Sequence, residues 1–195
     1  MTPLPLTRVS WPRRTARLAL RPATGDDLRA VFDIHALPEV GQWETEHPTS
    51  YAAFVLRFGE HDLLARTLVI VLDGVVIGDL YLRVSPAWAQ ADTADRAGEE
   101  AEIGWCVSPD HQGRGYATEA TTELVRVCFE DLGVRRVTAA AFAANAPSLR
   151  LMERLGMRQE SHHVRDSLHR DLGWIDGVDY ALLADEWRAS RPPTG

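Results

Sequence analysis

The sequence predicts a mixed α/β fold, a single sheet with helices on both of its faces. Runs of β-branched and aromatic residues, such as residues 68–72 and 101–107, are typical of strands. Other segments repeat apolar residues at helical spacing between capping residues. The predicted order is a strand, two helices, antiparallel strands, two strand–helix pairs and two final strands. Such an order is typical of a layered α/β sheet.

The sequence of the N-terminal region predicts a loose arm, followed by a strand and a helix. Residues 1–13 hold three prolines and no periodicity, so we expect a loose arm there. Residues 18–21 indicate a short strand. Thr24 and Asp27 resemble a capping box at the start of the first helix, and we expect Pro38 to stop that helix.

A loop, a second helix and a hairpin are predicted next. The loop covers residues 39–48, and the helix begins after Ser50 and ends at Gly59. Asp73-Gly74 is a strong two-residue turn between two strands. Residues 85–98 form a long connection, which we interpret as a flexible insertion or a lid.

The second half of the chain alternates strands and helices. After the strand at 101–107 we expect a helix that Gly133 closes, then a strand over residues 134–142. Asn145 or Ala146 caps the next helix, which ends at Gly156. A last hairpin pairs residues 157–165 with 177–183. We therefore expect one domain over residues 14–189 and a tail over 190–195.

Composition excludes several classes of protein. The 195 residues carry a formal net charge of −7, which argues against nucleic acid as a partner. Cys106 and Cys128 are the only cysteines, and we expect both to be small core residues in a reducing compartment. No apolar run approaches the roughly 20 residues that span a membrane, and no signal-peptide core is visible. We expect a cytoplasmic protein with no membrane partner.

A glycine turn lies between the strand at 101–107 and the helix that follows. Residues 110–118 include two glycines and one arginine and lack proline, so every residue keeps its backbone N–H. Such a turn can surround an anion at a helix N-terminus, where the helix dipole also favours negative charge. The chain has no Walker A motif (Gly-x4-Gly-Lys-Ser/Thr). It also lacks the Gly-x-Gly-x-x-Gly motif of dinucleotide-binding folds, because Thr118 occupies the position of the third glycine. We interpret the turn as a pyrophosphate cradle.

The string Gln112-x-x-Gly115-x-Ala117 resembles the acetyl-CoA-binding motif of the GCN5-related N-acetyltransferase (GNAT) superfamily. Within it, residues 14–189 are most similar to the RimJ/RimL-type branch. The segments that carry this resemblance are Ile77-Gly78-Asp79, Ala101-Glu102-Ile103-Gly104-Trp105, residues 112–120, Asn145-Ala146-Pro147-Ser148, residues 153–157 and residues 174–187. It implies the GNAT fold, with a mixed, mostly antiparallel sheet, and N-acetyl transfer.

The resemblance also implies acetyl-CoA as the cosubstrate. We expect the pantetheine arm beside the central strand and on Asn145, and Arg154 near the 3′-phosphate, with the helix surface as the alternative for Arg154. A backbone N–H near Cys106 or Val107 would face the thioester oxygen. The residues expected around acetyl-CoA are Trp105, Cys106 and Val107 on the strand, the N–H groups of Gln112, Gly113, Arg114, Gly115, Tyr116 and Ala117 in the turn, the Thr118 hydroxyl, Asn145, Ser148 and Arg154.

Two side chains are candidates for proton transfer. A lysine amine is only about 0.04% deprotonated at pH 7 and an α-amine about 14%, so a lysine needs a base more. Glu102 is the candidate base, although it could instead only orient the amine, and Glu100 shares its face of the strand. No tyrosine occurs in the helix after Asn145, so Ser148, or water, is the candidate that protonates the thiolate.

The acceptor is expected to be a primary amine, on a protein N-terminus or a small molecule such as an aminoglycoside or polyamine. A non-catalytic acyl-CoA-binding module is the alternative from another class. His162 and His163 point to opposite strand faces and cannot share a metal, and no cysteine or third ligand supports them, so we expect no metal. We expect a monomer or homodimer. The candidate acceptor residues are Trp43, Glu44, Glu46, Trp88, His162 and Trp174.

Overall fold

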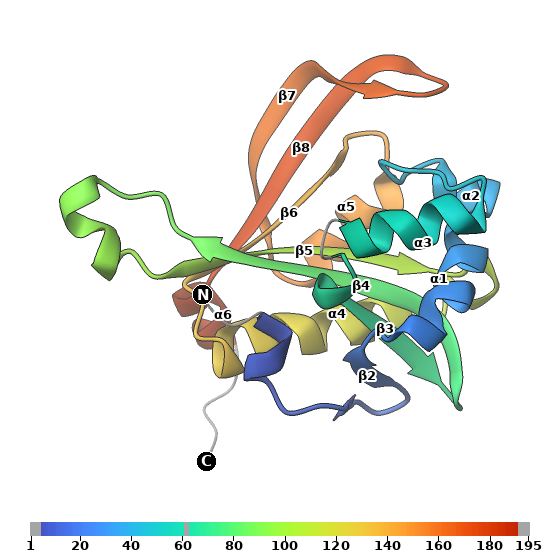
Figure 1. Cartoon of the computed structure of the whole chain (residues 1–195). Helices are drawn as coiled ribbons and strands as arrows, with labels where there is room; N and C mark the ends of the chain where they lie inside the picture. The colour runs from blue at the N-terminus through green and yellow to red at the C-terminus, as the bar shows by residue number, and fades with distance from the viewer. Residues whose placement is uncertain (1–4, 61–62, 191–195) are drawn as a thin grey trace. The chain divides into compact units, whose positions relative to one another are not determined.

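The structure, a computed structural model, describes residues 5–60 and 63–190. Its described strands form one eight-stranded sheet in the order β1–β2–β3–β4–β5–β6–β8–β7 (Figure 1). The strands are β1 (Arg13–Arg14), β2 (Ala19–Pro22), β3 (Thr67–Leu72), β4 (Val75–Pro86), β5 (Glu99–Val107), β6 (Arg136–Phe142), β7 (Arg158–His169) and β8 (Gly173–Leu183). The α-helices are α1 (Leu28–His35), α2 (Pro38–Gly41), α3 (Tyr51–Glu60), α4 (Tyr116–Arg126), α5 (Ala146–Arg154) and α6 (Ala184–Ala189).

Shorter helical turns complete the described part. They are the 3-10 turns η1 (Pro5–Arg8), η2 (Gly25–Asp27), η3 (Leu64–Arg66), η4 (Ala91–Arg96) and η5 (Pro109–His111), and the π turn η6 (Val127–Asp131). Consecutive strands from β1 to β4 pair antiparallel, as do β6 with β8 and β7 with β8. β5 pairs with β6 in parallel. The predicted mixed, mostly antiparallel sheet is confirmed.

The chain divides into two compact units by its internal contacts. Of the described residues, the first unit holds 5–60, 63–82 and 104–124, and the second holds 83–103 and 125–190. The strands β4 and β5 and the helix α4 contribute residues to both. The single domain expected over residues 14–189 stays a prediction.

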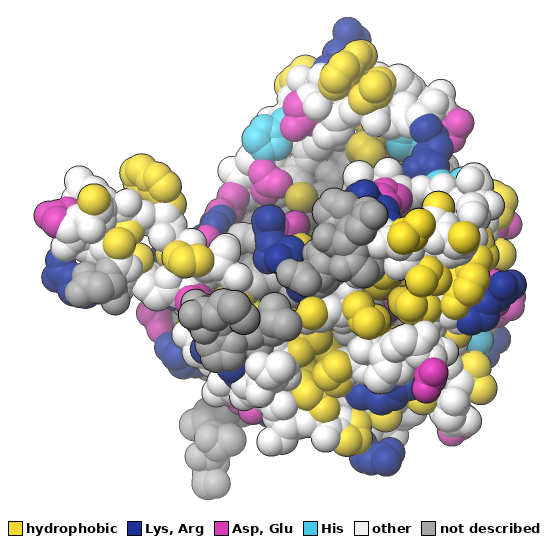
Figure 2. All heavy atoms as spheres, in the orientation of Figure 1, with side chains coloured by type: hydrophobic (Ala, Val, Ile, Leu, Met, Phe, Trp, Pro, Cys, Tyr) yellow, Lys and Arg dark blue, Asp and Glu magenta, His cyan; other side chains and the backbone are white. Residues whose placement is uncertain are grey.

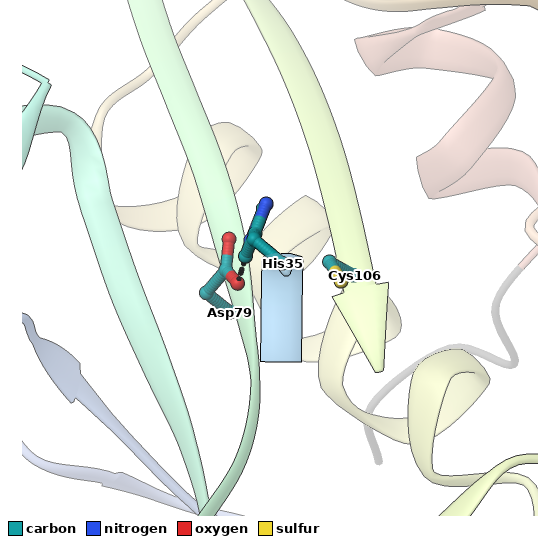
Figure 3. Close-up of side chains that lie close together, drawn as sticks. All are labelled: His35, Asp79 and Cys106. Atoms are coloured by element: carbon teal, nitrogen blue, oxygen red, sulfur yellow. Dashed lines mark hydrogen bonds and ion pairs between the residues drawn. The ribbon is translucent and has the colours of Figure 1, made fainter. Parts of the chain in front are cut away.

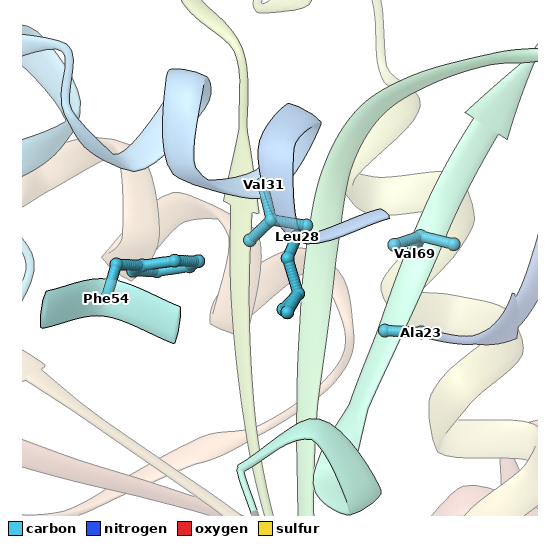
Figure 4. Close-up of a cluster of buried hydrophobic side chains, with 5 residues drawn as sticks. All are labelled: Ala23, Leu28, Val31, Phe54 and Val69. Carbon is cyan, nitrogen blue, oxygen red and sulfur yellow. The ribbon is translucent and has the colours of Figure 1, made fainter. Parts of the chain in front are cut away.

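In the first unit, a buried apolar cluster joins two helices to a strand (Figure 4). Leu28 and Val31 of α1 and Phe54 of α3 pack with Val69 of β3, and Ala23 extends the cluster. The helical spacing of these residues places them on one face of each helix. Each side chain of this kind contributes roughly 1.5–3 kcal/mol when it is fully buried, so the cluster fixes α1 against the sheet.

In the second unit, β8 lies between β6 and β7 and pairs with both. β7 and β8 form the long final hairpin that the sequence predicts (Figure 1). Phe129 of η6 packs on Trp187 of α6, with ring centroids 5.2 Å apart. Gly133 (φ 69°) and Gly156 (φ 78°) end their helices in the left-handed conformation expected of closing glycines.

Several predicted boundaries are wrong. Pro38 begins α2 instead of only stopping α1, because proline at the first helical turn lacks an N–H that would be unpaired there anyway. The predicted loop over 39–48 therefore starts as a helix, and α3 continues one residue past Gly59. The predicted connection over 85–98 contains the end of β4 and the turn η4, so it is partly regular structure.

The predicted loose arm is also partly ordered. Leu6 and Val9 are buried, and residues 5–14 include η1 and β1, because these apolar side chains reach the core. Residues 1–4 of the arm, and all of the predicted tail except Ser190, lie outside the described residues. In the part of the chain that is described, no helix combines the length and apolar character needed to cross a membrane.

Candidate active site

The glycine turn lies in the first unit, where β5 gives way to η5 and then to α4. Gly113 (φ 71°) and Gly115 (φ 81°) both adopt the left-handed conformation, which disfavours any residue with a Cβ. Residues 112–115 are exposed, and a Cβ added at Gly113 would meet no atom within 4 Å. The turn therefore presents an open backbone at the N-terminus of an 11-residue helix.

Gln112 plays a different part from the one expected. Its backbone N–H donates to the carbonyl of Pro109 at 3.2 Å, so this N–H is not available to an anion. Its side-chain Nε2 donates to the carbonyl of Val107 at 2.8 Å. Gln112 therefore braces the turn against the end of β5, and the expected N–H donors reduce to residues 113–117.

Arg17 is a functional candidate that the sequence analysis missed. Its Nη1 donates to the carbonyl of Arg114 at 3.0 Å, and its guanidinium lies 4.5 Å from the centre of the Tyr116 ring. Glu119 of α4 holds it, with Oε2 2.7 Å from both Nε and Nη2. The Arg17–Glu119 ion pair thus lies beside Gly115 and holds the turn in place. No motif marked Arg17, because its partners are about 100 positions away along the chain.

The first unit also contains a polar cluster of His35, which is partly buried, and the buried Asp79 and Cys106 (Figure 3). His35 is the last residue of α1, and Asp79 and Cys106 lie on β4 and β5. The His35 Nε2 atom is 2.7 Å from Oδ1 of Asp79. Gly78 allows β4 to lie close to Cys106 of β5, because a Cβ at this position would lie only 2.2 Å from the carbonyl oxygen of Cys106.

Burial and charge set the protonation of this cluster. Burial lowers the pKa of His35, but the Asp79 carboxylate more than offsets it, so the net pKa is raised and His35 is a cation at pH 7. Burial raises the pKa of the Cys106 thiol to about 12, so the thiol stays protonated. Burial also raises the pKa of Glu44 to about 7, with the charge of His35 opposing the rise. The charges of His35 and Asp79 therefore act on Glu44 in opposite directions.

Binding of a metal ion to this cluster would require the release of two protons. The candidate ligand atoms of His35, Asp79 and Cys106 all lie within 4.8 Å of one another. Metal ions bind neutral imidazole and thiolate, so an ion would have to displace a proton from His35 and another from Cys106. The protonated cluster already pairs its charges without an ion.

The carboxylates expected as bases lie in the second unit and are ion-paired. Glu102 pairs with Arg83, and the two side chains are 42% and 51% exposed. Glu100 pairs with Arg135 and Arg136. Catalysis by Glu102 stays a prediction, and its carboxylate already has a cationic partner in water.

Asn145 and Ser148 meet at the start of α5. The Asn145 Oδ1 atom accepts a hydrogen bond from the Ser148 N–H at 3.2 Å, which is the helix-capping role expected for Asn145. Asn145 is buried and Ser148 is partly buried. Arg154, on the last turn of α5, is exposed. The expected contacts of these residues with acetyl-CoA stay predictions.

The aromatic acceptor candidates differ in exposure. Trp43 and Trp105 are partly buried, whereas Trp88 is 95% and Trp174 61% exposed. His162 is hydrogen-bonded to Asp176 at 2.6 Å. Figure 2 shows hydrophobic side chains on the segment around η4 and at the tip of the β7–β8 hairpin. The acceptor roles of these residues stay predictions.

Comparison with known proteins supports one family. A model of the acetyltransferase (GNAT) domain matches residues 17–158. Over 86 residues, 44% of this chain and 50% of the relative, the sequence is 35% identical to the uncharacterized N-acetyltransferase YnaD of Bacillus subtilis. It is 27% identical to the L-amino acid N-acetyltransferase AaaT of Escherichia coli over 74% of this chain and 85% of AaaT. The match therefore spans only half the length of YnaD.

Solved structures share the fold. A GNAT-family acetyltransferase from Bacillus anthracis superposes with a TM-score of 0.75 at 24% identity, over 90% of this chain and all of that one. RimL, a ribosomal L7/L12 α-N-protein acetyltransferase solved with coenzyme A, gives 0.73 at 17%, over 88% and 97%. Spermidine N-acetyltransferase from Vibrio cholerae, solved with CoA and spermine, gives 0.74 at 18%, over 89% and 99%.

Proposed function

Because the chain belongs to the GNAT acetyltransferase family, we propose that it is an N-acetyltransferase that moves an acetyl group from acetyl-CoA to a primary amine. The observation that carries this proposal is the exposed glycine turn at the N-terminus of α4. Its N–H groups, with the Arg17 guanidinium beside them, suit the pyrophosphate of coenzyme A.

In this proposal, the amine attacks the thioester carbon directly. A nitrogen–carbon bond forms, the carbon–sulfur bond breaks, and the sulfur leaves as the thiol of coenzyme A. A backbone N–H near Cys106 or Val107 stabilises the carbonyl oxygen during the attack. Asn145 binds the pantetheine amide, and Ser148 or water supplies a proton to the sulfur. Glu102 is the base that the sequence suggests.

A protein or peptide N-terminal α-amine is the acceptor class that we propose first. An α-amine is already partly deprotonated at pH 7, so it makes the smaller demand on a base. Related structures include enzymes named for a protein N-terminus and for spermidine, so the family supports either class of amine. Cytoplasmic location and a monomeric or homodimeric state remain predictions.

The test is a direct assay of the purified protein. Incubation with acetyl-CoA and a panel of peptides, amino acids, polyamines and aminoglycosides should release free coenzyme A thiol with at least one amine. Mass spectrometry should then show a 42-dalton increase in that amine, as acetylation requires. Micromolar acetyl-CoA binding by calorimetry without turnover on any amine would instead identify a non-catalytic acyl-CoA-binding module.

A further inference from the structure

We propose that Arg17 is a positioning residue for coenzyme A, and that it sets the direction of the peptide bond between Arg114 and Gly115 so that the Gly115 N–H faces the pyrophosphate. The inference rests on the proposed function, in which the glycine turn binds that group. Arg17 acts through the backbone of the turn and does not have to touch the ligand. The cosubstrate site thereby extends to residues 15–18, ahead of β2, where no candidate site residue was expected.

The guanidinium of Arg17 fixes which way one peptide of the turn points. Its Nη1 donates to the carbonyl oxygen of Arg114 at 3.0 Å. The peptide between Arg114 and Gly115 is trans, so its C=O and N–H lie in one plane and point in opposite directions. The N–H of Gly115 therefore points away from Arg17, and an anion bound to this N–H lies on the other side of the peptide.

Glycine makes this hydrogen bond necessary. Gly115 (φ 81°) has access to positive and negative φ alike, so the Arg114–Gly115 peptide can rotate at little cost when nothing holds its carbonyl. A rotated peptide would turn the carbonyl oxygen of Arg114 towards the pyrophosphate, and its partial negative charge would repel that anion. The bond from Arg17 opposes this rotation.

Glu119, on the first turn of α4, holds Arg17 in this position. Its Oε2 atom is 2.7 Å from both Nε and Nη2 of Arg17. Its Oε1 atom accepts the backbone N–H of Arg17 at 2.8 Å and the hydroxyl of Thr15 at 2.6 Å. All of these residues lie in the first unit. The turn is therefore ordered before a ligand arrives, which lowers the cost of binding.

Calorimetry with coenzyme A is the first arm of the test. Arg17→Ala removes the bond to the Arg114 carbonyl but keeps the backbone N–H that bonds to Glu119, and it should raise the Kd of coenzyme A about tenfold. The Kd of 3′-dephospho-CoA, which retains the pyrophosphate, should rise by the same factor. Unchanged affinity in Arg17→Ala would overturn the inference. So would a loss confined to coenzyme A, because Arg17 would then act on the 3′-phosphate.

Kinetics with an accepted amine separate this role from a general structural one. In Arg17→Ala the KM for acetyl-CoA should rise about tenfold, while kcat stays within about twofold of its value in the unaltered protein. S-acetylpantetheine lacks the pyrophosphate, so its kcat/KM should be the same in both proteins. An equal loss with S-acetylpantetheine would show that Arg17 acts on the fold as a whole and would contradict the inference.

A double variant separates peptide orientation from charge. Removing the Arg17 side chain also leaves Glu119 without its cation, and repulsion between this carboxylate and the pyrophosphate is the competing explanation. Arg17→Ala combined with Glu119→Gln removes that repulsion but leaves the Arg114 carbonyl unheld. Its affinity for coenzyme A should stay as low as that of Arg17→Ala. Recovery to within about twofold of the unaltered protein would identify charge as the cause.

Arg29 on α1 offers a matched control within the first unit. It also pairs with a carboxylate, with Nη2 3.1 Å from Oδ1 of Asp33, and its guanidinium lies 5.2 Å from the centre of the Tyr51 ring. Arg29→Ala should leave the affinity for coenzyme A within about twofold. If Arg17→Ala does not fold, Arg17→Lys decides the question, because a lysine keeps the charge but lacks the planar fork that joins Glu119 to the Arg114 carbonyl. Unchanged affinity in Arg17→Lys would then overturn the inference.

Failure of the proposed function looks different from failure of this inference. An unaltered protein that binds coenzyme A but acetylates no amine would refute the acetyl transfer, and calorimetry would still decide the role of Arg17. An unaltered protein that does not bind coenzyme A would refute the cradle, and the inference would fall with it.

Discussion

The two units of this protein differ in the acidic residues that they bury, because Asp27 and Asp79 both lie in the first unit. In the first unit, Asp27 and Asp79 are buried against Arg21 and His35. In the second unit, Glu102 and its neighbours pair with arginines at the surface. The pKa of a buried carboxyl group depends on the few charged and polar groups next to it, whereas water and salt screen the charges at the surface. The comparison indicates that buried ion pairs are found in the first unit, whereas both units carry ion pairs at the surface.

The surface pairs of the second unit form a connected chain. Glu100 bonds to Arg135 and Arg136, Arg136 also bonds to Glu160, and Glu160 bonds to Arg158. Arg158 then continues the chain to Glu186 of α6. Exposed pairs of this kind contribute about 0–1 kcal/mol each, so the chain adds little to stability and much to the charge pattern of the surface.

The largest expected effect concerns two glycines of similar conformation. Gly115→Glu places a carboxylate at φ 81° in the proposed cradle and should weaken acetyl-CoA binding about 1,000-fold, through repulsion and lost N–H contacts. Gly98→Glu makes the same change at φ 74° in the second unit and should leave affinity within about twofold. Calorimetry measures both, and equal affinities would show that the cradle is elsewhere.

The next effect in size is the loss of stability when one partner of an ion pair is removed, compared between a buried carboxylate and one at the surface. Asp79→Asn leaves the partly buried His35 without its carboxylate partner and should cost about 3 kcal/mol of unfolding free energy. Glu160→Gln, in the surface chain, should cost less than about 1 kcal/mol. Urea unfolding at pH 7 compares the two. Similar losses would contradict the contrast between the units.

The smallest effect is the pH dependence of the Arg21–Asp27 pair. Hydrogen bonds from Arg21 hold the pKa of Asp27 down at about 2, below its ordinary value of 3.8. A lowered pKa in the folded state means that this stabilisation is present above the ordinary pKa and is lost as the pH falls towards 2.

Unfolding experiments at pH 5 and pH 2 test this dependence. The unaltered protein should lose about 2 kcal/mol more between these values than Asp27→Asn, which has no proton to take up there. Asp33→Asn is the control, because Asp33 pairs with Arg29 on the exposed face of α1. A loss in Asp27→Asn equal to that of the unaltered protein would show that Asp27 is not the group that titrates.

Local patterns predicted the elements well where one short-range cause dominates. The Asp73-Gly74 turn has both residues at positive φ, and Thr24 donates its N–H to Asp27 as a capping box requires. The glycine turn and the cap at Asn145 were predicted for the same reason. Pro38 was misjudged, because a proline marks a helix start as readily as a helix stop.

By itself, the sequence determined the fold class, the glycine turn and the membership of the family, because each depends on residues that are close together along the chain. Only the tertiary structure brought His35, Asp79 and Cys106 within reach of one another and placed Arg17 beside the turn. Burial and contacts between residues far apart along the chain decided these arrangements, and neither has a signal in local spacing.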